Sequence, residues 1–367
     1  MKKLYYHSFN LAKEAYANQS DRDIIGDYYE ALMGYFASNA GKKGGEFYTP
    51  SEVSKLMAKL VTNDVTSARA ISDPTCGSGS LLIKVAKELE AKGGNVGTLY
   101  GQEQDHLTSR LAKMNMCIHN ISNLDFSIEC CDTLNIHDTS EGKYFDITVA
   151  NPPYSIKWDN GEYHYDDPRF LGYGALAPKG TADLAFLQHI IYHMTDTGRA
   201  AVLLPLGVLF RGNAEEKIRT ALIDTYNVID SVIQLPSNLF YGASIPVCCI
   251  ILRKDRGDRN DILMINASDE FIKSGNKNAL SDDNIFNVYK DRTDIPYFSA
   301  VVDREIIRNN KYNLNIPLYI EAEKITEQHD LSALFKEFSE LDNKERQLKE
   351  SINLQLQLFG IEQRFTM

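Results

Sequence analysis

The stretch ITVANPPYSI, residues 147–156, places an amide and an aromatic ring directly after an apolar run. Proline cannot donate a hydrogen bond to a sheet ladder, and it biases the residue before it toward extended backbone. The run Phe145–Ala150 must therefore end here. Asn151 and Tyr154 are then held on a stiff, extended tip, which suits the binding of a flat substrate.

This tip could act on an aromatic exocyclic amine. The nitrogen lone pair of such an amine is delocalised into the ring, so it is a poor nucleophile. Two acceptors aligned with its N–H groups, the Asn151 side-chain carbonyl and the Pro152 backbone carbonyl, would free that lone pair. Tyr154 offers a face on which a base can stack, worth about 1–3 kcal/mol in nucleic-acid complexes. Catalysis would rest on positioning and electrostatics; an ordinary strand-end turn is the competing interpretation.

A second cluster, ISDPTCGSGSLL, combines an aspartate with two glycines ahead of a helix. Glycine lets backbone approach a ligand closely, and the amides of a helix start favour an anionic group. The dinucleotide pattern GxGxxG is half met, because Gly77 and Gly79 are present but Leu82 fills the third position. Glu103, after the next apolar run, could accept hydrogen bonds from both ribose hydroxyls. Asp73, the two glycines and Glu103 thus predict a nucleotide-like cofactor, and the loss of the third glycine weakens a nicotinamide assignment.

The elements that must position these residues alternate along the chain. Apolar runs of strand length alternate with helical patterns of ten to fifteen residues, which predicts an α/β fold with a doubly wound, mainly parallel seven-stranded sheet. Ligands bind at the carboxyl ends of strands in such sheets, where Asn151 lies. The predicted strands are 68–73, 98–103, 126–132, 144–151, 199–205, 228–236 and 247–254, and the predicted helices are 51–61, 79–93, 106–120, 181–194 and 213–226.

Composition limits the possible classes. The chain has 367 residues, of which 43% are hydrophobic and 24% charged, as in globular proteins. It shows no apolar run of membrane-spanning length and no signal peptide, so we expect a cytoplasmic protein without a membrane partner. Its six cysteines lack the spacing of a zinc site and fit reduced thiols, so we expect no metal.

The net charge of −11 argues against a protein that grips nucleic acid unaided. Local basic groups could still contact phosphates, with an ordinary solvated surface as the competing interpretation. These groups are Lys157, Arg169, Arg211, Arg253 and Arg256.

The C-terminal region 321–367 carries a heptad pattern. Leu331, Phe338, Ile352 and Phe359 keep one seven-residue spacing, interrupted by Glu345, and Leu334, Leu341 and Leu348 keep a second. Such a seam packs against another helix. The partner is either the rest of this chain or a second protein.

Together these blocks resemble the S-adenosylmethionine-dependent N6-adenine DNA methyltransferases. Residues from about 20 to 265 look more closely like the methylase subunit of type I restriction–modification systems. The matching blocks are GKKGGEFYTP, DPTCGSGSLL, GQE with LAKMNMCIHN, NPPY, DDPRFLGYGALAPKGTADLAFLQH, GRAAVLLPLGVLFRG and LPSNLFYGASIPVCCIIL.

The resemblance implies a role for each matching residue. Phe47, Tyr48, Thr49 and Pro50 would border S-adenosylmethionine, and Asp73, Gly77, Gly79 and Ser80 would hold its methionyl part. Glu103 would bind the ribose and Asp132 would face the adenine of the cofactor. Asn151, Pro152, Pro153 and Tyr154 would hold the target adenine, with Asn151 also next to the cofactor. Ala182, Asp183 and Phe186 match a block near the cofactor pocket.

The resemblance also implies partners: duplex DNA, a separate specificity subunit docked through the C-terminal helix, and a restriction subunit. The implied domains are a helical segment 1–45, as a short form or remnant of a longer N-terminal domain, a catalytic domain 46–265, a mixed extension 266–320 and the C-terminal helix 321–367. The alternatives are a protein glutamine N5-methyltransferase, which also uses NPPY on a planar amide, and a non-catalytic subunit that binds cofactor.

Overall fold

The computed structural model divides the chain into two compact units, residues 1–321 and 322–367. Most of the predicted helical segment 1–45 lies outside the described residues, and so does Phe47. The described residues are Tyr29, Leu32, Gly34, Tyr35 and the ranges 48–122, 124–240, 245–274, 277–321 and 331–360.

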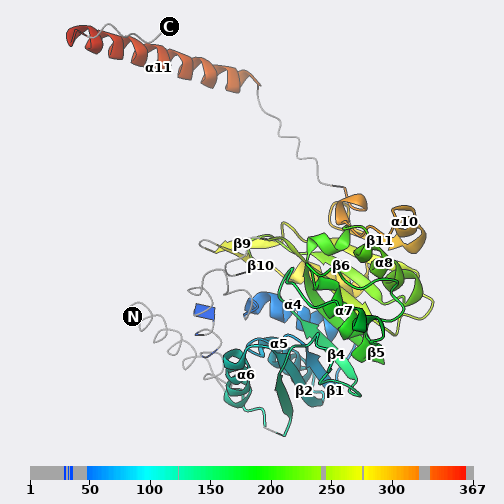
Figure 1. The fold of residues 1–367 in the computed structure, drawn as a ribbon. Helices are drawn as coiled ribbons and strands as arrows, with labels where there is room; N and C mark the ends of the chain where they lie inside the picture. Colours follow the sequence, from blue (N-terminus) through cyan, green and yellow to red (C-terminus); the bar gives the residue numbers. More distant parts are fainter. Residues whose placement is uncertain are drawn as a thin grey trace. The chain divides into compact units, whose positions relative to one another are not determined.

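Within the described residues, nine strands of the first unit form one sheet in the order β11-β8-β6-β7-β5-β4-β1-β2-β3 (Figure 1). β7 runs antiparallel to both of its neighbours and β11 runs antiparallel to β8, while the other pairs are parallel. The strands are β1 Ala68–Asp73, β2 Val96–Glu103, β3 Phe126–Cys130, β4 Phe145–Ala150, β5 Met194–Pro205, β6 Ile229–Gln234, β7 Val247–Arg253, β8 Asp261–Asn266 and β11 Ser299–Asp303.

The α/β class and the seven predicted strands are confirmed. The sheet contains two strands more than expected, β8 and β11, which extend one edge beyond β6. A separate hairpin of β9 Phe271–Ser274 and β10 Lys277–Leu280 precedes β11.

Helices cover both faces of the sheet. Successive residues of a strand point to opposite faces, so apolar residues along one strand can pack against helices on both sides. On β5, Leu203 belongs to one buried cluster, whereas Val202 and Leu204 belong to the other. The first cluster includes side chains of α4 Ser51–Val61, α5 Ser80–Ala91, α6 His106–Ile118 and α9 Asp283–Asp291. The second includes side chains of α7 Asp183–His193, α8 Ala214–Thr220 and α10 Arg304–Asn309.

Short helical turns complete the first unit. They are the 3-10 turns η2 Glu162–Tyr165, η3 Leu206–Leu209 and η5 Ile316–Leu318, and the π turn η4 Ala221–Thr225.

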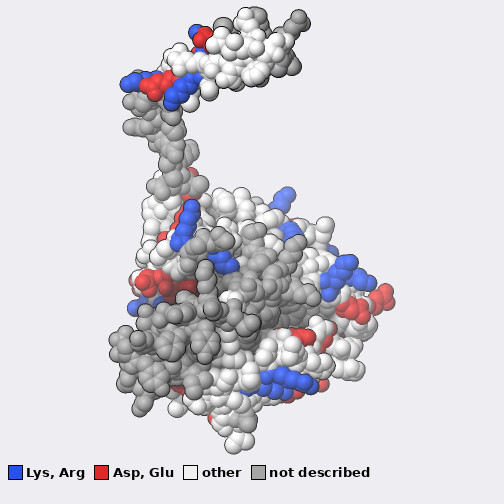
Figure 2. Space-filling model, turned by 90° about the vertical axis from the view of Figure 1, so that its left-hand side faces the viewer, with Lys and Arg blue, Asp and Glu red and all other residues white. Residues whose placement is uncertain are grey.

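The second unit contains α11, Leu331–Leu358, a helix of 28 residues where the heptad pattern predicts one. Seam residues Phe338, Leu341 and Leu348 are 58–68% exposed. Charged residues are confined to its first twenty positions, and 351–360 carries none; Figure 2 shows the charged side chains gathered toward one end of the helix. None of the described helices is both long enough and apolar enough to cross a membrane.

Candidate active site

The sheet topology brings the predicted site residues to one edge. β1 lies between β2 and β4, all three parallel, so their carboxyl ends meet. Asp73 and Glu103 are the last residues of β1 and β2, and Asn151 directly follows β4. Pro152 and Pro153 end β4, as the inability of proline to donate to a ladder requires.

The glycine turn after β1 is built as the sequence predicts. Gly77 and Gly79 have φ angles of 51° and 77°, a left-handed geometry that favours glycine. Gly77 N donates to Glu103 Oε2 at 3.0 Å, which ties the turn to the end of β2. Gly79 is the N-cap residue of α5, and the hydroxyls of Ser78 and Ser80, the residues on either side of it, lie 2.9 Å apart.

A first cavity lies over this turn. It is lined by Thr49, Asp73, Thr75, Cys76, Gly77, Ser78, Ser80, Leu81 and Asn151. Asp73 is fully buried; its Oδ1 accepts from Thr75 N at 3.0 Å, but its Oδ2 has no hydrogen-bond partner among the described residues. Burial raises the pKa of Asp73 to about 8, and the Glu103 carboxylate contributes to the rise. A buried carboxyl with a spare oxygen fits the ammonium group of an amino-acid moiety.

A second cavity of about 740 Å³ adjoins the first at Thr75, which lines both. This volume is in the usual range for small-molecule sites. Glu103 and Asp132 line it from the ends of β2 and β3, and Pro153 and Phe186 line it from the NPPY loop and α7. The two cavities thus collect most of the residues expected at the cofactor.

Three predicted cofactor neighbours lie elsewhere. Tyr48 and Pro50 are buried and line neither cavity; Pro50 is the residue before α4, where its carbonyl accepts from Ser54 N at 3.0 Å. Gly79 shapes the turn without lining either cavity. The GEFYTP block therefore reaches the first cavity through Thr49.

The carboxamide of Asn151 is held at both ends. Its Nδ2 donates to Thr49 Oγ1 at 3.0 Å, and its Oδ1 accepts from the Tyr154 hydroxyl at 2.7 Å. The Tyr154 ring is half-buried and meets Phe240 edge to face, with centroids 6.2 Å apart. Burial raises the pKa of Tyr154, and its neutral hydroxyl donates to Asn151.

Asp183 fixes the other end of the NPPY loop. Ser155 has a φ of 51°, and its N–H donates to Asp183 Oδ1 at 2.7 Å. The carboxylate is fully buried, and its Oδ2 lies 3.3 Å from Arg211 Nη1. Asp183 lines neither cavity, so its contacts indicate a loop-positioning role that the sequence block could not specify.

The five basic residues differ in their surroundings. Lys157 is exposed and lines the second cavity. Arg211 and Arg253 are ion-paired with neighbouring carboxylates. Arg169 and Arg256 are both buried against carbonyl and carboxylate oxygens. They are therefore neither available to contact phosphates nor part of a solvated surface.

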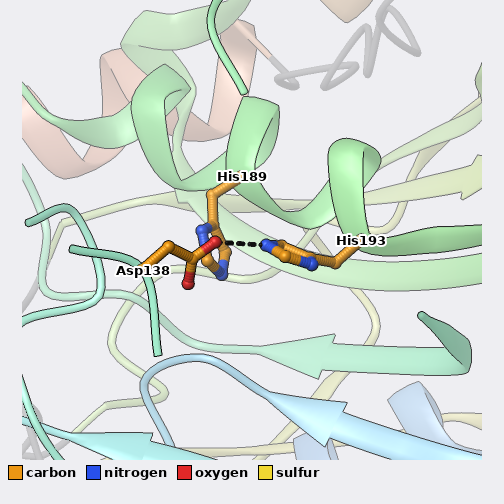
Figure 3. Close-up of side chains that lie close together, drawn as sticks. All are labelled: Asp138, His189 and His193. Atoms are coloured by element: carbon orange, nitrogen blue, oxygen red, sulfur yellow. Dashed lines mark hydrogen bonds and ion pairs between the residues drawn. The ribbon is translucent and has the colours of Figure 1, made fainter. Parts of the chain in front are cut away.

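Asp138, His189 and His193 form a cluster, with both histidines on α7 (Figure 3), and Asp138 lines a further cavity together with Arg169 and Tyr192. His193 faces an acceptor with each nitrogen: Nδ1 lies 2.9 Å from Lys143 O and Nε2 2.7 Å from Asp138 Oδ2. Burial alone would raise the pKa of Asp138, but the hydrogen bond from His193, the nearby His189 and the Ser140 N–H together hold it below its usual range. The Arg169 guanidinium lies 3.3 Å from His189 Nδ1, and its positive charge disfavours a metal cation at this position. We therefore describe the cluster as a joint, a set of polar contacts that connects α7 to the loop after β3.

Comparison with known proteins identifies the family of this chain. The family described as N-6 DNA Methylase matches residues 20–328. The type I restriction enzyme MpnII methylase subunit of Mycoplasma pneumoniae is 37% identical over 342 residues, covering 90% of this chain and 63% of the relative. The MjaVII methylase subunit of Methanocaldococcus jannaschii is 34% identical over 349 residues, covering 91% and 59%.

Among solved structures, the type I restriction-modification system methyltransferase subunit from Streptococcus thermophilus is similar with a TM-score of 0.76 at 42% identity. The match covers 82% of this chain and 64% of that one. The chain thus spans less than two thirds of the length of each of these relatives. These matches confirm the resemblance drawn from the sequence, and the chain belongs to the N-6 DNA methylase family.

Proposed function

We propose that this protein transfers a methyl group from S-adenosylmethionine to N6 of an adenine in DNA, as the modification subunit of a type I restriction–modification complex. The observation that carries the proposal is the position of Asn151. Its carboxamide lines the first cavity together with Asp73 and the glycine turn, so the acceptor group lies directly beside the proposed cofactor. The names of the similar proteins support DNA as the substrate.

The residues present fit the cofactor. Asp73 would pair with its ammonium group, the turn at Gly77 and Ser80 would lie against the rest of its methionyl part, and Glu103 would accept from its ribose. Asp132 and Phe186 would flank its adenine in the second cavity. When bound, the cofactor supplies an electrophilic sulfonium methyl group.

Asn151 and Pro152 would orient the target amine. Asn151 Oδ1 and the Pro152 carbonyl would accept hydrogen bonds from its two N–H groups and direct the lone pair toward the bound cofactor, without an ionised base. The methylated nitrogen would then lose its extra proton to solvent, and the cofactor would leave as a neutral thioether. The target adenine must first leave the duplex stack. The Tyr154 hydroxyl now bonded to Oδ1 would give way to the amine, while the Tyr154 ring provides the stacking face.

Partner subunits would supply DNA recognition. The chain is acidic, with a net charge of −11, and on the face in Figure 2 the described basic side chains are interspersed with acidic ones. A surface of this kind is poorly suited to gripping phosphates unaided. We infer that a specificity subunit docks on the exposed seam of α11 and reads the sequence, and that a restriction subunit completes the complex.

The test is methyl transfer from labelled S-adenosylmethionine to duplex DNA by the chain with its specificity subunit. Asn151→Ala should lower the rate by more than tenfold, about 1.4 kcal/mol of barrier, because an acceptor of the amine is lost. Cofactor affinity, measured by calorimetry, should change less than threefold.

Asn287→Ala, at an exposed position on α9, is the matched control and should keep full activity. Label on a protein glutamine instead of DNA would establish the N5-glutamine alternative. Cofactor binding without any transfer would establish the non-catalytic one.

A further inference from the structure

We propose that Thr49 is a positioning residue for the methyl-transfer reaction, acting through the carboxamide of Asn151. This inference rests on the proposed function and adds to it a residue whose hydroxyl serves the target base. The resemblance places Thr49 only at the border of the cofactor.

The contact is direct and shielded from water. Thr49 Oγ1 accepts from Asn151 Nδ2 at 3.0 Å, and the two residues are 7% and 8% exposed. They are 102 positions apart in the chain and come from the segment before α4 and the loop after β4. Because few waters reach this contact, a lost partner on either side is poorly replaced by solvent.

The backbone that carries Thr49 is rigid. The Ser54 hydroxyl lies within 3.4 Å of Thr49 O and 3.1 Å of Pro50 O, and the ring of Pro50 restricts its own φ. α4 is anchored by the fully buried Val53, Leu56 and Met57. Thr49 Oγ1 is therefore a fixed point against which the Asn151 side chain can be oriented.

The orientation matters because the two ends of a carboxamide differ. The target amine presents N–H donors, so it requires Asn151 Oδ1 on its side. Nδ2 then points away from the substrate and needs an acceptor. In the described structure that acceptor is Thr49 Oγ1, and it remains when the Tyr154 hydroxyl leaves Oδ1 for the incoming base.

Removing the hydroxyl leaves a buried donor without a partner in the productive orientation. Thr49→Val keeps the shape of the side chain and removes the acceptor, whereas Thr49→Ser keeps the acceptor. Because Thr49 also lines the first cavity, the turnover rate and cofactor affinity must be measured separately.

The experiment compares the two variants in the full chain with its specificity subunit, using labelled S-adenosylmethionine and duplex DNA. We expect Thr49→Val to lower kcat about tenfold while the cofactor Kd stays within threefold. Thr49→Ser should restore most of the lost kcat. Thermal melting checks folding; if Thr49→Val does not fold, Thr49→Cys, similar in size to serine but a weak acceptor, replaces it.

Two results would overturn the inference: equal kcat values for the valine and serine variants, or a loss in the valine variant that is explained by weaker cofactor binding. Failure of the wild-type complex to label DNA is a different result. It would remove the proposed function itself, and this inference with it.

Discussion

At the scale of single residues, Asp73 is the most unusual group of the site. It is fully buried at the end of β1, and one of its oxygens has no partner among the described residues. Burial raises the pKa of Asp73 to about 8, so we expect the cofactor-free protein to hold a proton on this carboxyl at neutral pH. An incoming ammonium group favours the ionised carboxylate, so binding should release that proton.

The affinity for S-adenosylmethionine should therefore rise with pH from about 6 toward 8, by up to tenfold per pH unit, and level off near pH 8. The sign follows because the free protein binds more protons than the complex in this window. Calorimetry in buffers of different ionisation enthalpy would measure the proton release directly. Asp73→Asn should weaken binding and flatten the profile; a flat profile in the wild type would contradict this role.

The strand-end positions of Asp73, Glu103 and Asn151 could be predicted from sequence, because each follows an apolar run of strand length. Their side-chain partners could not. The Thr49–Asn151 contact joins segments 102 residues apart, and only the assembled sheet brings them together. The sequence predicts only a stacking face for Tyr154, and the bond of its hydroxyl to Asn151 is seen in the structure alone.

At the scale of elements, the joint between α7 and the loop after β3 depends on Asp138. Its carboxylate accepts from His193 at 2.7 Å and lies 3.9 Å from Arg169. Because α7 also carries Phe186 and Asp183, this joint helps to hold two parts of the site in register.

Asp138→Asn should destabilise the fold by about 2 kcal/mol at pH 7, since it removes the carboxylate that accepts a hydrogen bond from buried His193 and lies near buried Arg169. The pKa of Asp138 is lowered on folding, so its contribution is full above its unfolded pKa of about 4 and disappears as the pH falls below that value. Thermal melts at pH 7 and pH 3 should show the gap to wild type narrowing in acid. Asp125→Asn, an exposed control, should be neutral, and a gap independent of pH would refute the assignment.

The elements also show where sequence patterns reach their limit. Of the strands that line the site, β1, β2 and β4 contain apolar runs that lie next to glycine or proline, and the sequence predicts all three as well as β3. β8 and β11 were not predicted, because a run of four apolar residues such as Ile262–Ile265 can belong to a strand or a helix. Both strands extend the sheet on the far side of β6, away from the cofactor edge.

At the scale of the whole molecule, the proposed docking of a partner rests on the seam of α11. Phe338, Leu341 and Leu348 are all more than half exposed, and contiguous apolar surface of this kind marks an interface. Predicting the helix and its heptads needed only the sequence. The heptads alone do not distinguish between packing on the rest of this chain and packing on a second protein.

Leu341→Glu with Leu348→Glu should abolish co-purification with the specificity subunit, because two carboxylates would be buried in an apolar contact. Cofactor binding by the variant chain should be unchanged, which separates docking from misfolding. Asn343→Glu, an exposed position on the opposite side of α11, should leave the complex intact. Survival of the complex in the double variant would show that the partner binds elsewhere.

The reversed strand β7 has a consequence for synthesis of the chain. β5 is followed by β6, yet its neighbour in the sheet is β7, with Pro205 opposite Val247. While the ribosome is still making residues 206–246, one edge of β5 has no strand to pair with. Unpaired apolar strand edges promote association between chains. The nascent protein is therefore most prone to aggregate, and most in need of chaperones, while residues 206–246 are being made.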